Sequence, residues 1–172
     1  MLNSKLRKVV LYEVLSILKS PFAAVGQTSL DREVGKLNVG FAVNAPQGLV
    51  VPVVKDAADK TLAEIGREET LLTDKARDNK LTLEEIEGET IALSNLGAYG
   101  IDSFLGIIPP PASTILSVGN VIPTVVCRDG EMEARKIVSL SVAADRRILG
   151  EIYTAEFLNY IKDRLQNPQQ VI

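Results

Sequence analysis

The feature that most constrains the fold is an alternation of helix-like and strand-like segments along the chain of 172 residues. Apolar residues recur at helical spacing in three segments, over 6–18, 61–77 and 151–165. Short apolar runs typical of strands lie between them, over 37–43, 49–54, 90–95, 114–118, 123–128 and 135–144. This alternation predicts an α/β fold, and the length suits one domain, 1–172, with a sizeable core.

Turn and capping residues place the ends of these segments. Proline restricts the residue before it, so Ser20-Pro21 ends the first helix. A threonine followed three residues later by a glutamate predicts a capped helical turn, and the chain has two such pairs, Thr61 with Glu64 and Thr82 with Glu85. Hairpin turn chemistry occurs twice, at Ala45-Pro46-Gln47-Gly48 and at Asp129-Gly130.

The helical spacing also predicts which side chains face the core. In the second helix we expect an inward face formed by Leu62, Ile65, Leu71 and Leu72. In the last helix we expect one formed by Ile152, Phe157, Leu158, Ile161 and Leu165.

The composition excludes several classes of function. The chain has no histidine and a single cysteine, Cys127, so it holds neither an intrachain disulfide nor a metal site built on His and Cys. Because Cys127 follows two valines, we expect a packed thiol. A net charge of -3 gives no electrostatic reason to bind nucleic acid or an anionic membrane. We expect neither partner, and no apolar run approaches the roughly 20 residues of a spanning helix.

Two further sequence features resemble general functional motifs only in part. Gly97-Ala-Tyr-Gly100 lacks the third glycine and the βαβ context of a dinucleotide-binding loop. Four glutamates, Glu84, Glu85, Glu87 and Glu89, resemble a catalytic carboxylate cluster. No apolar surroundings would raise a carboxyl pKa there, so we expect a solvated helix end and loop.

A long central block carries a family resemblance. It begins at Ser94-Asn-Leu-Gly, continues through Gly100-Ile-Asp-Ser-Phe and Pro109-Pro-Pro, and ends at Ile115-Leu-Ser-Val-Gly119. This block resembles the catalytic domain of the 2-oxo acid dehydrogenase dihydrolipoamide acyltransferases. The resemblance extends upstream through Gly48-Leu-Val-Val-Pro-Val-Val-Lys-Asp56 and downstream to Asn167-Pro168.

The resemblance implies a fold, partners and substrates. The fold is that of chloramphenicol acetyltransferase, a mixed sheet covered by helices and assembled as trimers, which build cages in many members. The expected partners are further copies of the chain, an active dihydrolipoamide acyltransferase core, or both. Coenzyme A and lipoamide are the family substrates, and no cofactor is certain. The compartment is the mitochondrial matrix in a eukaryote and the cytoplasm in a bacterium.

Two positions depart from the family's catalytic signature, which reads Asp-His-Arg-x-x-Asp-Gly. Aligned without gaps, Arg146 stands at the histidine and Gly150 at the second aspartate, flanked by Asp145 and Arg147. Thiol attack needs a base poised near neutral pH. Arginine cannot accept a proton there, and losing a general base costs about 100- to 10,000-fold in rate.

Neither Ser94 nor Glu151 restores a complete catalytic site. Ser94 matches the hydroxyl that, in the family, stabilises the oxyanion from a neighbouring subunit, and an oxyanion donor without a base is half a site. A packing role for Ser94 at a strand end is the alternative. Glu151 is displaced by five residues from the histidine position and begins a helix, where the dipole lowers a carboxyl pKa, so it is a poor substitute base. The family's usual first strand and helix have no match here.

Three functions remain open. The first is a non-catalytic core module of a 2-oxo acid dehydrogenase complex, most simply the pyruvate complex, similar to the component X branch of the family. The second is an acyltransferase with a rearranged site, moving an acyl group between dihydrolipoyl groups and coenzyme A. The third is a regulatory module that binds coenzyme A without turnover.

Overall fold

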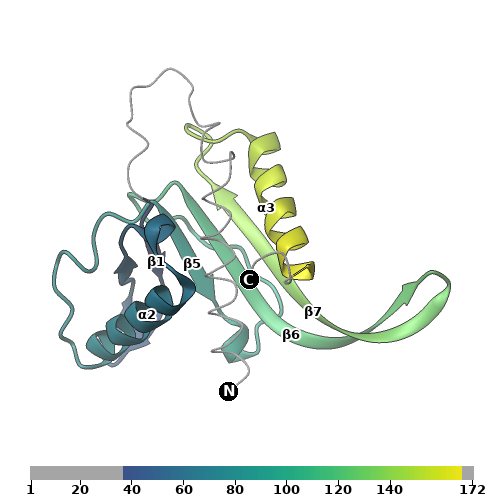
Figure 1. Cartoon of the computed structure of the whole chain (residues 1–172), viewed down its shortest axis with the longest axis horizontal. Coiled ribbons are helices and arrows are strands. Elements are labelled where there is room, and N and C mark those ends of the chain that lie inside the picture. The colour runs from purple at the N-terminus through teal and green to yellow at the C-terminus, as the bar shows by residue number, and fades with distance from the viewer. Residues whose placement is uncertain (1–36, 168–172) are drawn as a thin grey trace.

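The computed structural model describes residues 37–167, so the helix predicted over 6–18 lies outside the described part. Its framework is a five-stranded sheet in the order β4-β1-β5-β6-β7. The strands are β1 (Val39–Phe41), β4 (Val53–Val54), β5 (Ile91–Asn95), β6 (Thr114–Arg128) and β7 (Glu131–Ala144). Two helices, α2 (Leu62–Arg77) and α3 (Glu151–Gln166), accompany the sheet (Figure 1).

The sheet is mixed, which confirms the predicted α/β architecture. β5 lies parallel to both β1 and β6, while β4 and β7 are antiparallel at the two edges. Hydrogen bonds join the start of β1 to that of β5, because Thr90 Oγ1 accepts from Asn38 N and donates to the Asn38 carbonyl. The central strand β5 ends at Ser94 and Asn95, which pair with Ser117 and Val118 of β6.

The two strand-like runs on either side of Pro46 behave differently from the prediction. We expected one hairpin of two continuous strands, but each run divides between two sheets. β2 (Val43–Ala45) and β3 (Gly48–Val50) form the predicted hairpin, with Ala45 opposite Gly48. The remainder of each run, β1 and β4, pairs within the main sheet. A short 3-10 turn, η2 (Ala57–Asp59), follows β4.

Helix α2 begins at the predicted capping box, in which Thr61 Oγ1 accepts from Glu64 N and the Glu64 carboxylate accepts from Thr61 N. Its inward face differs from the expected one. Leu62 and Leu71 are exposed, so that part of the prediction is wrong. The buried side of α2 is formed by Ile65, Glu69, Leu72, Thr73 and Ala76. The helix is thus rotated so that two polar residues enter the interior.

Strands β6 and β7 form a long hairpin that extends well beyond the body of the molecule (Figure 1). We predicted two strands over 114–118 and 123–128, but these are one strand with an irregularity between Val118 and Val121. The turn at Asp129 and Gly130 is as predicted, since both residues have positive φ. We call the part beyond the irregularity, residues 121–138, the arm.

Helix α3 closes the core against β6 and β7. Its Phe157 and Ile161 are buried together with Leu116 and Val118 of β6, while Leu158 and Leu165 pack partly buried against this cluster. Ile152, which we expected on the inward face, is 78% exposed, so its assignment is wrong. No helix within residues 37–167 is long and apolar enough to cross a membrane.

Candidate functional site

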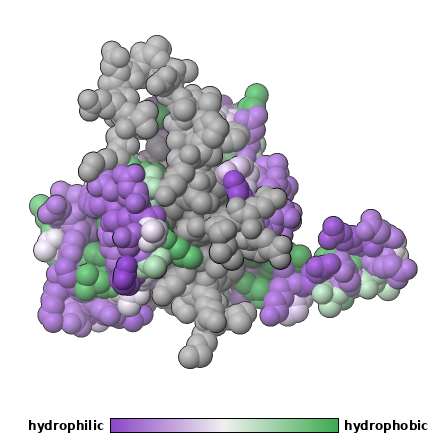
Figure 2. Space-filling view, in the orientation of Figure 1, coloured by the Kyte–Doolittle hydropathy of each residue, from purple (hydrophilic) through white to green (hydrophobic). Residues whose placement is uncertain are grey.

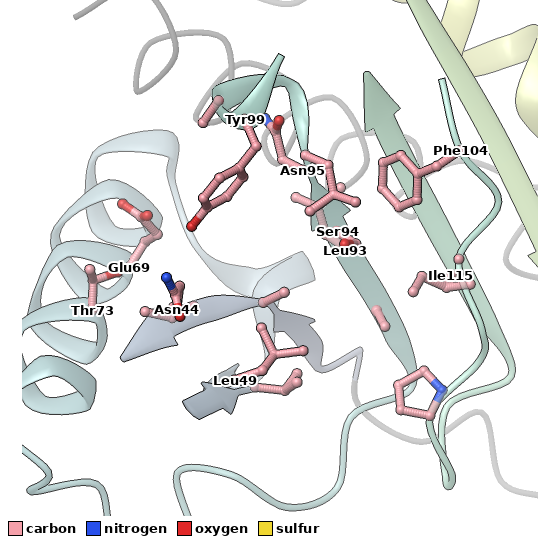
Figure 3. A pocket seen from close by; sticks show the side chains of 18 of the residues that line it. Asn44, Leu49, Glu69, Thr73, Leu93, Ser94, Asn95, Tyr99, Phe104 and Ile115 are labelled. Atoms are coloured by element: carbon pink, nitrogen blue, oxygen red, sulfur yellow. The ribbon is translucent and has the colours of Figure 1, made fainter. Parts of the chain in front are cut away.

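Ser94 lies at the carboxyl end of β5, opposite Ser117 of β6. It lines a cavity of about 810 Å³ whose walls come from β2, α2, β5 and the loop around Phe104 (Figure 3). The carboxyl ends of parallel strands are the usual place for a ligand site in an open α/β sheet. Ser94 is half-buried. Its position is therefore suited to a hydroxyl that contacts a ligand in the cavity.

The chain after Ser94 turns sharply. Asn95 Oδ1 accepts a hydrogen bond from Gly97 N at 3.0 Å, and a 3-10 turn, η3 (Gly97–Tyr99), follows. A Cβ placed on Gly97 would lie 2.4 Å from the Gly119 carbonyl oxygen, so only glycine fits against β6 there. This close approach brings Tyr99 to the mouth of the cavity, where Figure 3 shows its hydroxyl directed toward Asn44.

The opposite wall of the cavity is the irregular segment 101–113. The Ser117 hydroxyl accepts from Gly106 N at 3.0 Å, and the Ser141 hydroxyl donates to the Phe104 carbonyl. These two bonds fasten the segment across β6 and β7. They hold Phe104 against the cavity, while Leu105 and Ile107 are exposed at its edge.

Arg146 lies elsewhere, just after β7. Its guanidinium forms an ion pair with Glu151, the first residue of α3, and both side chains are largely exposed. The two residues line a separate, smaller cavity of about 300 Å³ together with Val142 and Leu158. Within one chain, therefore, Arg146 and Ser94 line different cavities.

Asp145 and Arg147, which flank Arg146, form a pair of their own. Arg147 Nε lies 3.0 Å and 3.1 Å from the two carboxylate oxygens of Asp145, and Arg147 Nη2 lies 2.6 Å from one of them. The Arg147 side chain and then its backbone N–H lower the pKa of the Asp145 carboxyl to about 2. The pair fixes the turn between β7 and α3, as a structural ion pair would.

Gly150 is the N-cap of α3, and because glycine has no side chain, the helix start lacks a side-chain cap. Its φ of -71° and ψ of 156° are accessible to any residue, and a Cβ there would meet no atom within 4 Å. An aspartate would therefore fit this position. The sequence comparison alone singled out Gly150, since nothing local strains it.

The prediction that the Cys127 thiol is packed is wrong. Cys127 lies in the arm, opposite Met132, and is exposed rather than packed. The local run of valines indicated burial, but no element of the described chain covers this part of the hairpin. No group of three or more potential metal ligands occurs within residues 37–167.

The acidic stretch is only partly solvated. Glu89 is buried, contrary to the expectation of a solvated loop. Glu85 lies 2.5 Å from Lys75 of α2 and accepts from Thr82 N at 2.9 Å, as the predicted capped turn requires. The hydrogen bond from Lys75 is the main cause that lowers the pKa of Glu85. Glu85 thus ties the loop to α2.

The fold and the block around Ser94 define a core domain of the acyltransferase class. Residues 25–172 match the family of 2-oxoacid dehydrogenases acyltransferase (catalytic domain), and the chain belongs to that family. It is 32% identical over 145 residues to the mitochondrial pyruvate dehydrogenase protein X component of Mus musculus, covering 81% of this chain and 29% of that protein. The chain spans about a third of the length of the curated relatives it matches.

Two solved structures extend the comparison. The cubic core of the pyruvate dehydrogenase multienzyme complex has a TM-score of 0.83 and 27% identity, covering 95% of this chain and 69% of that one. The Azotobacter vinelandii dihydrolipoamide acetyltransferase, studied for the catalytic roles of a serine, a histidine and an asparagine, gives the same four values. In that protein the histidine follows the serine by 52 positions, and the asparagine follows the histidine by four.

Proposed function

We propose that this chain is a non-catalytic, self-associating core module of a pyruvate dehydrogenase complex. The chemistry at Arg146 supports the non-catalytic part. Ser94, Arg146 and Gly150 have the same two spacings as the serine, histidine and asparagine of the Azotobacter vinelandii enzyme. An arginine stays protonated at neutral pH, and here its charge is engaged by Glu151. The position therefore offers no proton acceptor to a thiol.

The observation that carries the self-association is the uncovered apolar face of the arm. In a strand, alternate residues share a face, and the register Val125 with Ala134 and Cys127 with Met132 places these four side chains together. They continue the face of β7 that packs under α3 through Leu140 and Val142. Val125 and Met132 are 67% and 81% exposed. We call Pro123, Val125, Cys127, Met132 and Ala134 the apolar arm face; Lys136, opposite Pro123, lies on the same face at its inner end.

The opposite face of the arm has different chemistry. Toward the tip it is mostly polar, with Thr124 opposite Arg135, Val126 opposite Glu133 and Arg128 opposite Glu131, whereas Ile122 lies opposite Ile137 nearer the body. Figure 2 shows the arm clear of the body, hydrophilic along one side and with hydrophobic residues along the other. Such a one-sided apolar surface is typical of a protein interface. A further copy of this chain, or a homologous active chain, is the partner that a core module of this family would meet.

Sedimentation velocity at micromolar concentration tests the proposal. We expect the wild type to sediment as an oligomer and Val125→Asp to shift it toward monomer, because a charge in an apolar contact is costly to desolvate. Thr124→Asp is the matched control, an adjacent residue on the other face, and should leave the oligomer intact. A wild type that sediments as a monomer would contradict self-association. Equal shifts of the sedimentation coefficient in the two variants would exclude the apolar arm face as the interface.

A second function, acyl transfer with a rearranged site, is favoured by one observation. Ser94 keeps its place at the cavity of about 810 Å³, as an oxyanion donor would require. A steady-state assay with acetyl-coenzyme A and dihydrolipoamide separates the two functions. The non-catalytic proposal predicts a rate at the uncatalysed background, whereas turnover that Ser94→Ala abolishes would establish an enzyme.

A module that binds coenzyme A without turnover is the third function. The cavity is large enough for part of such a ligand, but the charged residues that line it within 37–167 are Glu69, Asp74 and Arg77. Two carboxylates against one guanidinium oppose a polyanion. Calorimetric titration with coenzyme A should accordingly give no binding heat. A saturable heat would instead support a module that binds coenzyme A.

A further inference from the structure

Strand β7 lies at the edge of the sheet, because β6 is its only neighbouring strand within residues 37–167. A strand directs the backbone N–H and C=O groups of alternate residues to opposite sides, so half of these groups in β7 face away from β6. Along the arm, no other described element lies beside β7 (Figure 1). A strand edge of this kind is a template for pairing with another chain.

The edge of β7 in the arm carries neither a proline nor a bulge, two features that hinder strand pairing. Residues 131–138 of β7 contain no proline and keep an unbroken register with β6. The outer edge of β6 is less suitable, since it contains Pro123 and begins at the irregularity between Val118 and Val121. Charged side chains can also block an edge, so the signs of the charges along β7 decide which partner fits.

Glu133 and Arg135 lie two residues apart on the polar face of the arm. Within one chain they form an ion pair with 2.8 Å between Oε2 and Nη2, and their side chains remain 34% and 51% exposed. This contact uses one of the five N–H donors of the guanidinium and leaves both groups accessible. Each side chain can therefore also meet an opposite charge on a neighbouring strand.

Two copies of one strand can pair antiparallel only in certain registers. In β7 the residues that direct their backbone groups outward are either all even-numbered or all odd-numbered. The numbers of two opposed residues therefore add to an even number, and one residue lies opposite its own counterpart. A register centred on Glu133, Arg135 or Lys136 places like charges directly opposite, which is unfavourable. A register centred on Ala134 places Glu133 of each copy opposite Arg135 of the other.

From this complementarity we infer that β7 pairs with β7 of a second copy of the chain, antiparallel and two-fold symmetric about Ala134. Glu131 of one copy then lies opposite Ile137 of the other, so residues 131–137 of each strand form the contact. Opposite charges directly across an antiparallel pair stabilise it, and the two contacts between Glu133 and Arg135 fix this register. The outward backbone groups of both strands gain hydrogen-bond partners at the same time.

This inference rests on the proposed self-association and names one contact within it. A two-fold axis perpendicular to the sheet keeps the same face of both strands on one side, so the apolar arm faces of the two copies join into one wider surface. Strand pairing leaves that surface uncovered. Pairing of β7 and burial of the apolar arm face are therefore separate contacts, and they can fail separately.

Disulfide cross-linking of the whole chain tests the register. In a Cys127→Ser background, Ala134→Cys places two thiols directly opposite each other, within the Cα separation of about 4.4–6.8 Å that a disulfide spans. We expect oxidised glutathione to give a covalent dimer on non-reducing electrophoresis at micromolar protein concentration. Lys136→Cys in the same background is the matched control, because its counterpart lies four residues along the strand, about 13 Å away. It should give no dimer above the Cys127→Ser chain.

Charge reversal tests the contacts between the copies. In the Ala134→Cys background, Glu133→Arg or Arg135→Glu alone places like charges across the pair, and each should lower the cross-linked yield by about tenfold. An equimolar mixture of these two variants should restore the yield, because a chain with two arginines then faces a chain with two glutamates. The mixture restores opposite charges between chains and not within either chain, so restoration excludes the internal ion pair as the cause.

Two results would overturn the inference: Ala134→Cys that cross-links no better than Lys136→Cys, or a mixture that cross-links no better than the separate variants. If either occurs while the wild type still sediments as an oligomer, self-association stands without pairing of β7. A wild type that sediments as a monomer contradicts both.

Discussion

Arg146 and Glu151 form an ion pair with 2.5 Å between Nη2 and Oε1, across the turn that leads from β7 into α3. Arg146, which we align with the family's histidine, thus pairs with Glu151, one of the two carboxylates considered as a substitute base; Asp145 is the other. Both side chains are largely exposed, so the contact is a surface ion pair, and Arg146 itself offers no proton acceptor at neutral pH.

Restoring the family's signature should restore chemistry. In Arg146→His/Gly150→Asp we expect acetyl transfer to dihydrolipoamide at least about 100-fold above the wild-type rate, because a positioned general base contributes that much. Ser94→Ala added to this background should remove most of the gain. The measurement is steady-state turnover with acetyl-coenzyme A. No gain in a correctly assembled double variant would show that the site has lost more than its base.

Gly150→Asp alone should stabilise the domain. Gly150 is the N-cap of α3 and has room for a side chain. An aspartate there would accept from the first turn of the helix, raising the free energy of unfolding by about 0.5 kcal/mol. Urea denaturation measures this directly, with Gly150→Ala as the control that adds a Cβ without a cap. A loss of stability in Gly150→Asp would contradict the assigned cap.

Two glycines should respond oppositely to alanine. A Cβ on Gly119 would lie 2.0 Å from the Asp102 carbonyl oxygen, whereas a Cβ on Gly66, within α2, would meet nothing within 4 Å. We expect Gly119→Ala to lower the free energy of unfolding by about 3 kcal/mol and Gly66→Ala to raise it by about 1 kcal/mol. Chemical denaturation of both variants tests the packing of β6 against the segment after η3. A tolerated Gly119→Ala would show that this packing is looser than described.

Acid should weaken the Asp145–Arg147 pair in a defined window. The pKa of Asp145 is lowered to about 2 in the folded chain and is about 3.9 in an unfolded one. A lowered carboxyl pKa stabilises the fold above the unfolded pKa, and this contribution is lost as pH falls from about 4 toward 2. The difference in melting temperature between wild type and Asp145→Asn should therefore shrink over that window. A difference independent of pH would exclude the pair as its source.

The sequence predicted the kinds of elements better than their partners. The capping box at Thr61 and the turn at Asp129-Gly130 are local, and both are as expected. The division of 37–43 and 49–54 between two sheets depends on β1 pairing with β5, some 50 residues away, so no local pattern indicates it. Likewise the exposure of Cys127 follows from how far the arm extends, which its valines cannot reveal.

The candidate site residues have no local structural signature in the sequence. Ser94 is indicated by the family resemblance of the block that it begins, and Arg146 by its alignment with the family's catalytic signature; no periodicity selects either residue. The burial of Glu69 and Thr73 is not predicted, because the apolar pattern of α2 includes Leu62 and Leu71, which face solvent. A buried polar pair becomes visible only when the rotation of α2 on the sheet is known.

The arm also bears on the order in which the chain folds. Its strands are neighbours in sequence, so they can pair within about 1–10 μs, whereas Asn38 and Thr90 meet only after a span of 52 residues closes. We therefore expect the hairpin to exist while the rest of the domain is still forming. The apolar arm face would then be presented by a nascent chain, and association between copies could begin before either has completed its own sheet.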